Sequence, residues 1–181
     1  GSADLPLRKS RNAEIRIVGL KAYGKLRHQA FSVRAGDKNN MPGDKKIRTG
    51  QCHCGAVRFE ATLSDGFNSI RRCNCSYCRM RGAVVVMAET GGIKLLQGED
   101  ALTSYRFHTG VAQHFFCSRC GIYTHHQRRS DQSQYGVNVA CLDGVSPFDF
   151  PEVPVADGVN HPNDTGGPAR LAGTLRFIPA K

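Results

Sequence analysis

The chain lacks any run of apolar residues near the roughly 20 that a helix needs to cross a bilayer. It also lacks the shorter apolar stretch that marks the centre of a secretory signal peptide. We therefore expect no membrane contact and a cytoplasmic setting. Thiols stay reduced in that compartment, so clustered cysteines there indicate metal ligands or catalytic groups rather than disulfides.

Acidic residues are scarce in the first quarter of the chain. Residues 1–49 carry 12 Lys and Arg against 4 Asp and Glu, whereas residues 50–181 carry 13 against 11. The formal net charge of +10 is thus mainly a property of the first part. We predict that residues 1–49 form an irregular basic extension, in which Gly1 and Ser2 resemble a cloning scar. Such an extension is usually a solvated tail, but it can also bind nucleic acid or serve in targeting.

A long helical repeat is missing from residues 50–145, where the apolar pattern is short and alternating. Val57, Phe59 and Ala61 alternate with polar residues and predict a half-buried strand. The continuous apolar run 83–88 predicts a strand that is buried on both faces. Glycines separate most of the further strand candidates, which are 93–96, 102–108, 111–116, 122–126 and 134–142. We predict a mainly β domain over 50–181, with 146–170 as an irregular covering segment and 171–178 as a last strand or arm.

Clustered cysteine is what the sequence has in abundance. Seven of its eight cysteines fall into three short motifs: Cys52-His-Cys54, Cys73-Asn-Cys75-Ser-Tyr-Cys78 and Cys117-Ser-Arg-Cys120. Structural zinc sites take four protein ligands, whereas catalytic zinc sites usually take three and keep one position open. Seven clustered cysteines therefore suggest one site of each kind. The remaining Cys141 lies in an apolar run, and we expect it to be a small buried core residue.

Two divisions of the seven cysteines are open. In the first, the outer motifs combine into a four-cysteine group (Cys52, Cys54, Cys117 and Cys120), and the middle motif forms a three-cysteine group (Cys73, Cys75 and Cys78). Gly55 and Gly121 follow the outer pairs and suit the turns that such half-sites need. In the second, Cys75 and Cys78 join Cys117 and Cys120 as in a zinc ribbon. A single site, an iron–sulfur cluster or a redox dithiol also suits these ligands.

A histidine can close the fourth position of the three-cysteine group and would make that site structural. The candidates are His53, His108, His114, His125 and His126. An open position would instead leave room for a substrate atom.

The cysteine motifs and their surroundings resemble a known family. Residues 50–60, 73–79 and 116–121 are similar to the glutathione-dependent formaldehyde-activating enzyme family. Residues 103–107, 112–117 and 141–143 most resemble its centromere protein V-like branch. The resemblance covers residues 50–145.

The resemblance implies a compact, tent-like β-sheet fold built around zinc, with two ions per chain. It assigns the four-cysteine group to a structural zinc and the three-cysteine group to a catalytic zinc. It also implies a carbon–sulfur lyase of the S-(hydroxymethyl)glutathione synthase type, which joins a small thiol such as glutathione to formaldehyde or a small aldehyde. The alternative function is a zinc-stabilised binding module whose basic arm contacts nucleic acid or a protein partner.

Several side chains near the motifs are candidates for the same chemistry. His108 or His114 can move a proton, and Tyr105 and Gln113 are expected to line the pocket. Four arginines flank the middle motif and either offset its charge, hold a substrate carboxylate or are plain surface residues: Arg71, Arg72, Arg79 and Arg81.

Overall fold

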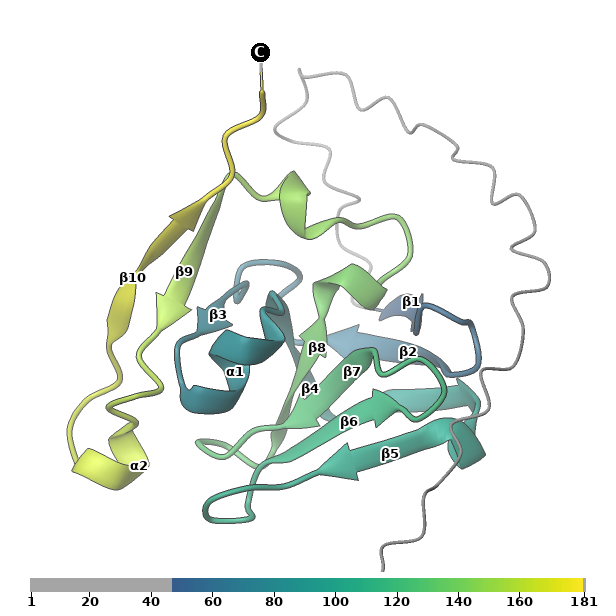
Figure 1. Ribbon diagram of the computed structural model, residues 1–181, viewed down its shortest axis with the longest axis horizontal. Coiled ribbons are helices and arrows are strands. Elements are labelled where there is room, and N and C mark those ends of the chain that lie inside the picture. Colours follow the sequence, from purple (N-terminus) through teal and green to yellow (C-terminus); the bar gives the residue numbers. More distant parts are fainter. Residues whose placement is uncertain (1–46, 181) are drawn as a thin grey trace, which may run out of the picture. The chain divides into compact units, whose positions relative to one another are not determined.

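The computed structural model describes residues 47–180, so the predicted basic extension lies outside the described residues apart from 47–49. The described part contains a seven-stranded antiparallel sheet with the strand order β1-β2-β4-β8-β7-β6-β5 (Figure 1). Its strands are β1 (Ile47–Gln51), β2 (Arg58–Leu63), β4 (Val85–Gln97), β5 (Leu102–Tyr105), β6 (Gln113–Cys117), β7 (Tyr123–Gln127) and β8 (Gln134–Asn138). The prediction of a mainly β domain is confirmed.

A smaller sheet stands beside the first, with the order β10-β9-β3 (Figure 1). It contains β3 (Arg72–Cys73), β9 (Glu152–Ala156) and β10 (Leu171–Arg176). The short helices are α1 (Ser76–Arg81) and α2 (Pro162–Thr165), with single 3-10 turns at Glu99–Ala101, Val139–Cys141 and Pro147–Asp149. Among the described residues, no helix is both long and apolar enough to span a membrane.

The predicted strands 83–88 and 93–96 are two halves of one strand, β4. Residues 84–88 are all buried, as predicted for this run. Val84, Val86 and Ala88 pack into the main core, while Val85 and Met87 point to the other face of the sheet and pack near Tyr123. Because side chains alternate along a strand, this pattern requires cover on both faces of the sheet.

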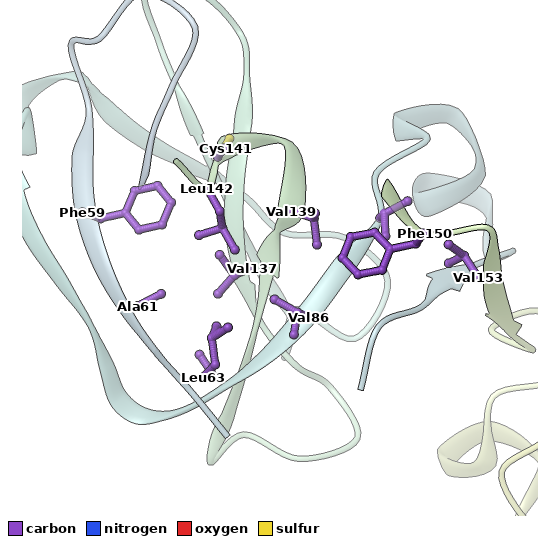
Figure 2. Packing of buried hydrophobic residues seen from close by; sticks show 12 residues of the cluster. Phe59, Ala61, Leu63, Val86, Val137, Val139, Cys141, Leu142, Phe150 and Val153 are labelled. Atoms are coloured by element: carbon purple, nitrogen blue, oxygen red, sulfur yellow. The ribbon is translucent and has the colours of Figure 1, made fainter. Parts of the chain in front are cut away.

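The main core lies on the first of these faces (Figure 2). Phe59, Ala61 and Leu63 on β2 are fully buried and confirm the predicted alternation. They pack with Val86 of β4 and Val137 of β8. Burial of each large aliphatic or aromatic side chain contributes about 1.5–3 kcal/mol. Cys141 belongs to the same cluster, as expected.

The segment 146–170 was expected to be irregular, and this expectation was wrong for two elements. It contains β9, which pairs antiparallel with β10 and parallel with β3, and the helix α2. Pro154 is tolerated in β9 because the ladder to β3 includes only Val155 and Ala156, so Pro154 has a strand partner on one side only. This segment matters for function because it is next to the three-cysteine group.

A buried histidine predicts a pH dependence of stability. His125 on β7 stacks on Phe115 at a centroid distance of 4.5 Å, and burial lowers the pKa of its imidazole to about 4 from 6.5. A histidine with a lowered folded-state pKa stabilises the fold above its unfolded pKa, and this contribution is lost as the pH falls from 6.5 towards 4. We expect His125 to account for a decrease of about 1.4 kcal/mol per pH unit in the free energy of unfolding over that window.

Urea unfolding of wild type and His125→Phe at pH 4.5, 5.5, 6.5 and 7.5 would measure this slope. Phe keeps the stacked ring but cannot be protonated, so the variant should lose stability less steeply between pH 6.5 and 4.5. Above pH 7 the two proteins should show the same slope. Equal slopes below pH 6.5 would contradict the prediction.

Candidate metal centre and pocket

The four-cysteine group comes together at one end of the large sheet. The sulfurs of Cys52, Cys54, Cys117 and Cys120 all lie within 4.8 Å of one another. The first pair lies in the turn between β1 and β2, and the second pair begins at the last residue of β6 and continues into the turn before β7. Two segments that are 63 residues apart in sequence thus meet at sulfur atoms.

Both turns use a glycine immediately after the cysteine pair. Gly55 and Gly121 each have a φ of 73°, in the left-handed region that side chains with a Cβ rarely adopt. Their amides donate to the carbonyls of Cys52 and Cys117 at 3.0 and 2.8 Å, which closes each turn. The role expected for these glycines in the turns is confirmed.

The three-cysteine group forms at the junction of β3 and α1. The sulfurs of Cys73, Cys75 and Cys78 lie within 4.8 Å of one another. Cys75 is the N-cap of α1, and its sulfur accepts a hydrogen bond from the amide of Cys78 at 3.5 Å. The sulfur of Cys73 accepts one from the amide of Cys75 at 3.4 Å. The backbone therefore directs N–H dipoles at the sulfurs, as a site for thiolates requires.

The electrostatics of the three sulfurs favour a cation. The pKa of the Cys78 thiol is raised, mainly by its hydrogen bond to Cys73 and to a smaller extent by that to Cys75. The pKa of Cys75 is lowered, mainly by its hydrogen bond to Cys73. One negative charge is thus shared among three sulfurs when no cation is present. A metal ion allows all three to be thiolates, and this soft donor set suits zinc. Both cysteine groups could therefore hold metal ions.

In the part of the chain that the structure describes, the three-cysteine group contains sulfur donors alone. None of the five histidine candidates belongs to it. His125 and His126 lie on β7, His114 lies on β6, and His108 is exposed and near Arg129, with 3.3 Å between its Nδ1 and Nη1 of the arginine. The division into four and three corresponds to the first of the two predicted groupings, while the roles of the cysteines as metal ligands remain predictions.

Arg81 connects the three-cysteine group to the large sheet. Its Nη2 donates to the sulfur of Cys78 at 3.5 Å, and its Nη1 lies 3.1 Å from Nδ1 of His114. The guanidinium lies 3.5 Å from the ring centroid of Tyr123. A cation held against a cysteine sulfur and an aromatic face offsets part of the negative charge of the three-cysteine group.

These contacts determine where two histidine protons are. A guanidinium only donates, so Nδ1 of His114 accepts and Nε2 carries the proton. Burial is the main cause that lowers the pKa of His114 to about 4, and the charge of Arg81 is the second. The lowered pKa keeps the ring neutral. The Tyr123 hydroxyl donates to the carbonyl of Gly136 at 2.9 Å and lies 2.5 Å from Nδ1 of His126. That Nδ1 therefore carries the proton of His126.

A cavity of about 560 Å³ adjoins the three-cysteine group. Its floor is the second face of the large sheet, including Val85, Met87, His114 and His126, and its rim includes His108 and Phe107. All four arginines predicted to flank the middle motif line it. Tyr105 and Gln113 were expected to line it as well, and this was wrong: Tyr105 stacks on Phe107, and Gln113 hydrogen-bonds to Arg106 and Ser104.

The C-terminal segment forms a wall of this pocket. The side-chain oxygen of Asn74, between two of the cysteines, accepts hydrogen bonds from the amides of Gly158 and Val159 at 2.7 and 3.1 Å. Its amide group donates to Asp157 at 3.2 Å. Asn74 therefore fixes the loop 157–160 against the three-cysteine group.

Sequence reasoning missed Asn74, Gly158 and Arg128 as neighbours of this site, and it considered His126 only as a fourth ligand rather than as a pocket residue. Asn74 was visible inside the middle motif, but its partners are more than 80 residues away. The signal for His126 was its position in an apolar strand segment, which also fits an ordinary core residue.

Comparison with known proteins agrees with the geometry. A family model described as glutathione-dependent formaldehyde-activating enzyme matches residues 47–153. A Halomonas elongata protein that carries this enzyme name provisionally is 30% identical over 79 residues, which are 39% of this chain and 50% of the relative. The chain thus spans half the length of this curated relative. The chain is also similar to a Rhodobacter sphaeroides protein of known crystal structure, with 53% sequence identity and a TM-score of 0.58. This match covers 59% of the present chain and 98% of the Rhodobacter chain.

Fold and site together define a mainly β protein with two cysteine groups that could hold metal ions. The family model covers more than half of the residues and includes all seven clustered cysteines. The chain belongs to the glutathione-dependent formaldehyde-activating enzyme family.

The contact between Gly158 and the cysteines predicts the effect of a single methyl group. A Cβ at Gly158 would lie 2.4 Å from the sulfur of Cys73 and 2.9 Å from Cβ of Cys75. In Gly158→Ala, either the loop or the sulfur must move, so we expect a tenfold or greater loss of zinc affinity at the three-cysteine group, of the order seen for second-sphere changes at about 10–100-fold. The melting temperature should change little.

Zinc affinity would be measured by competition with a chromophoric chelator. Gly167→Ala is the matched control because the nearest atom to its added Cβ is Oγ1 of Thr165 at 3.5 Å, an ordinary contact. Equal zinc affinities for the two variants would show that the loop does not constrain the cysteines.

Proposed function

We propose that this protein is a zinc-dependent carbon–sulfur lyase of the S-(hydroxymethyl)glutathione synthase type. It joins a small thiol such as glutathione to formaldehyde or a small aldehyde. The observation that carries the proposal is a group of three sulfurs, without a fourth donor among residues 47–180, beside a cavity of about 560 Å³. Family membership supports the same reaction.

We propose zinc for both cysteine groups, with two ions per chain. The four-cysteine group would hold a structural ion, since four donors complete a tetrahedral site, and Cys73, Cys75 and Cys78 would hold the catalytic one. Zinc in the three-cysteine group would supply Lewis acidity to stabilise a thiolate or polarise a carbonyl oxygen. Arg81 would then offset the negative charge of a centre that already contains three thiolates.

The reaction requires one proton transfer and one new bond. The thiol loses its proton, its sulfur bonds to the carbonyl carbon, and the carbonyl oxygen becomes a hydroxyl, so that atoms and charge balance. The proton that ends on this oxygen is the one that the thiol releases, while His114 offers its Nε2–H as a hydrogen-bond donor that would stabilise the negative charge on the oxygen. Nε2 of His114 is buried at the pocket floor and has no hydrogen-bond partner among the described residues. The proton on Nε2 follows from the contact of Nδ1 with Arg81.

The binding-module alternative draws no support from the described residues. Its basic arm lies almost entirely outside them, whereas the pocket beside the cysteines has the size typical of a small-molecule site.

Loss of one cysteine tests the reaction. We expect wild type with zinc to accelerate the exchange of ¹³C-labelled formaldehyde with glutathione in NMR exchange spectroscopy. Cys75→Ala should reduce the rate to that of buffer, because it removes one of three ligands and the acceptor of the Cys78 amide. Cys141→Ala is the control, since this cysteine lies in the core outside both groups. If wild type does not accelerate exchange with glutathione or other small thiols, the proposal is wrong.

The two metal sites should differ in their effect on folding. Elemental analysis of freshly purified wild type should find two zinc ions per chain. Cys117→Ala should lose zinc and unfold, because its group joins segments far apart in sequence and metal binding there is coupled to folding. Cys75→Ala should lose one ion and retain its far-UV circular dichroism spectrum and a cooperative melting transition. A folded Cys117→Ala variant would contradict the assignment of a structural site.

A further inference from the structure

The pocket beside the three-cysteine group has a large excess of positive charge. Seven arginines line it, against two aspartates. Asp164 forms an ion pair with Arg129. The carboxylate of Asp157 accepts hydrogen bonds from the side chains of Asn74 and Asn160 at 3.2 and 2.9 Å. Both acids are therefore committed to other groups, and the remaining arginines face the pocket without a carboxylate.

Arg71 and Arg128 are two of the pocket arginines that combine partial burial with the absence of a counterion, and burial lowers the pKa of both. Among residues 47–180, neither Arg71 nor Arg128 forms an ion pair. Arg128 donates to two neutral acceptors, the side-chain oxygens of Gln134 and Ser130. Asp65 and Asp131 act on Arg71 and Arg128 only at longer range, and Asp131 is engaged by Ser133. Both guanidiniums are partly buried and thus have lost some of their hydration.

The backbone holds these two arginines at fixed places. Arg71 exchanges two backbone hydrogen bonds of 2.9 Å with Val85 at the start of β4. Arg128 follows β7, and its amide donates to the carbonyl of Gln134 at 3.1 Å. The pKa of Arg128 is lowered mainly by burial and, as the second cause, by the positive charge of Arg71. The two cations therefore repel each other. An anion that contacts both would remove this repulsion.

The position of the two arginines suits a substrate that has two functional groups, because both line the cavity that adjoins the three-cysteine group. The charge of Arg71 acts on Cys73, and Arg128 lines the same cavity together with Met87 and His126. Arg81 is occupied by Cys78 and His114, so it belongs to the metal centre rather than to this pair. A thiol at the three-cysteine group would therefore extend its remaining atoms towards Arg71 and Arg128.

We propose that Arg71 and Arg128 form an anion-binding subsite that holds a carboxylate of the thiol substrate while its sulfur approaches the three-cysteine group. The subsite rests on the proposed function, which it deepens by making the substrate an anionic rather than a neutral thiol. Its opposite wall is the segment 156–170, which follows the residues that the family model matches. The selection of the thiol thus depends in part on residues outside the shared region.

The test compares two thiols that differ by one carboxylate. N-acetylcysteine and N-acetylcysteamine present the same thiol with and without that group. With zinc-loaded protein and formaldehyde, we expect kcat/KM to favour N-acetylcysteine by about tenfold or more, the size expected for charge-assisted hydrogen bonds. Arg71→Gln and Arg128→Gln should each reduce the ratio of the two kcat/KM values, and the double variant should bring this ratio to about one; an effect of either substitution on the metal centre itself acts on both thiols and cancels in the ratio.

Arg176→Gln is the control variant, because Arg176 pairs with Glu152 at the protein surface and does not line the pocket. It should keep the wild-type preference. Melting temperature and zinc content of each variant would verify that the fold and the metal sites are intact. Equal kcat/KM values for the two thiols in wild type, or an unchanged preference in the double variant, would overturn the subsite.

A binding measurement separates failure of the subsite from failure of the proposed reaction. S-methylglutathione has both carboxylates of glutathione but no free thiol, so calorimetric titration reports binding without turnover. Binding to wild type that weakens at least tenfold in the double variant supports the subsite even if no thiol is turned over, and in that case the reaction alone is wrong. Equal binding to wild type and the double variant overturns the subsite whatever the reaction.

Discussion

The mutual repulsion of thiolates is the constraint on which this structure depends. Two sets of sulfurs are each held within 4.8 Å, closer than several negative charges can be held without a cation. The protein holds the sulfurs in place by backbone geometry: two left-handed glycine turns for the four-cysteine group, and a strand end followed by a helix N-cap for the three-cysteine group. Because thiolates this close need a cation to offset their charge, the stability of the sites would be coupled to an ion bound there.

The two groups differ in what surrounds them, and this difference supports their different proposed roles. The four-cysteine group is packed with Val57 and Ala101 in a small apolar cluster at one end of the sheet. The three-cysteine group instead adjoins a pocket lined with arginine and histidine. An apolar environment suits a structural ion, whereas a pocket lined with charged side chains offers a substrate both space and binding partners. Arg81 links the three-cysteine group to the pocket, because it contacts both the sulfur of Cys78 and the ring of His114.

Local pattern was sufficient to predict much of the fold and the three cysteine motifs, whereas it left two divisions of the cysteines open. The alternation at Phe59 and Ala61 and the apolar run 83–88 determine strands because burial has a period of two in a sheet. Two elements were not predictable in this way. Helix α1 has six residues, too few to show a helical repeat, and β9 contains a proline that usually argues against a strand. The pocket could not be predicted either, because Asn74, Arg128 and Gly158 meet only through the arrangement of distant strands.

The residues proposed for the chemistry and some of the residues that shape the pocket lie in different parts of the chain. All seven clustered cysteines, Arg81 and His114 lie within residues 47–153, the region that the family model matches. Gly158 and the loop around it lie beyond that region, yet they are packed against Cys73 and form a pocket wall. Members of the family that share the cysteine motifs but diverge after residue 153 would keep the metal centre and enclose a different space beside it. Because the loop is tied to Asn74 within the cysteine motif itself, a change that reshapes the pocket for another thiol must also keep the fit of the loop against the sulfurs. Under the proposed function, substrate choice and metal retention would therefore be physically coupled in this chain.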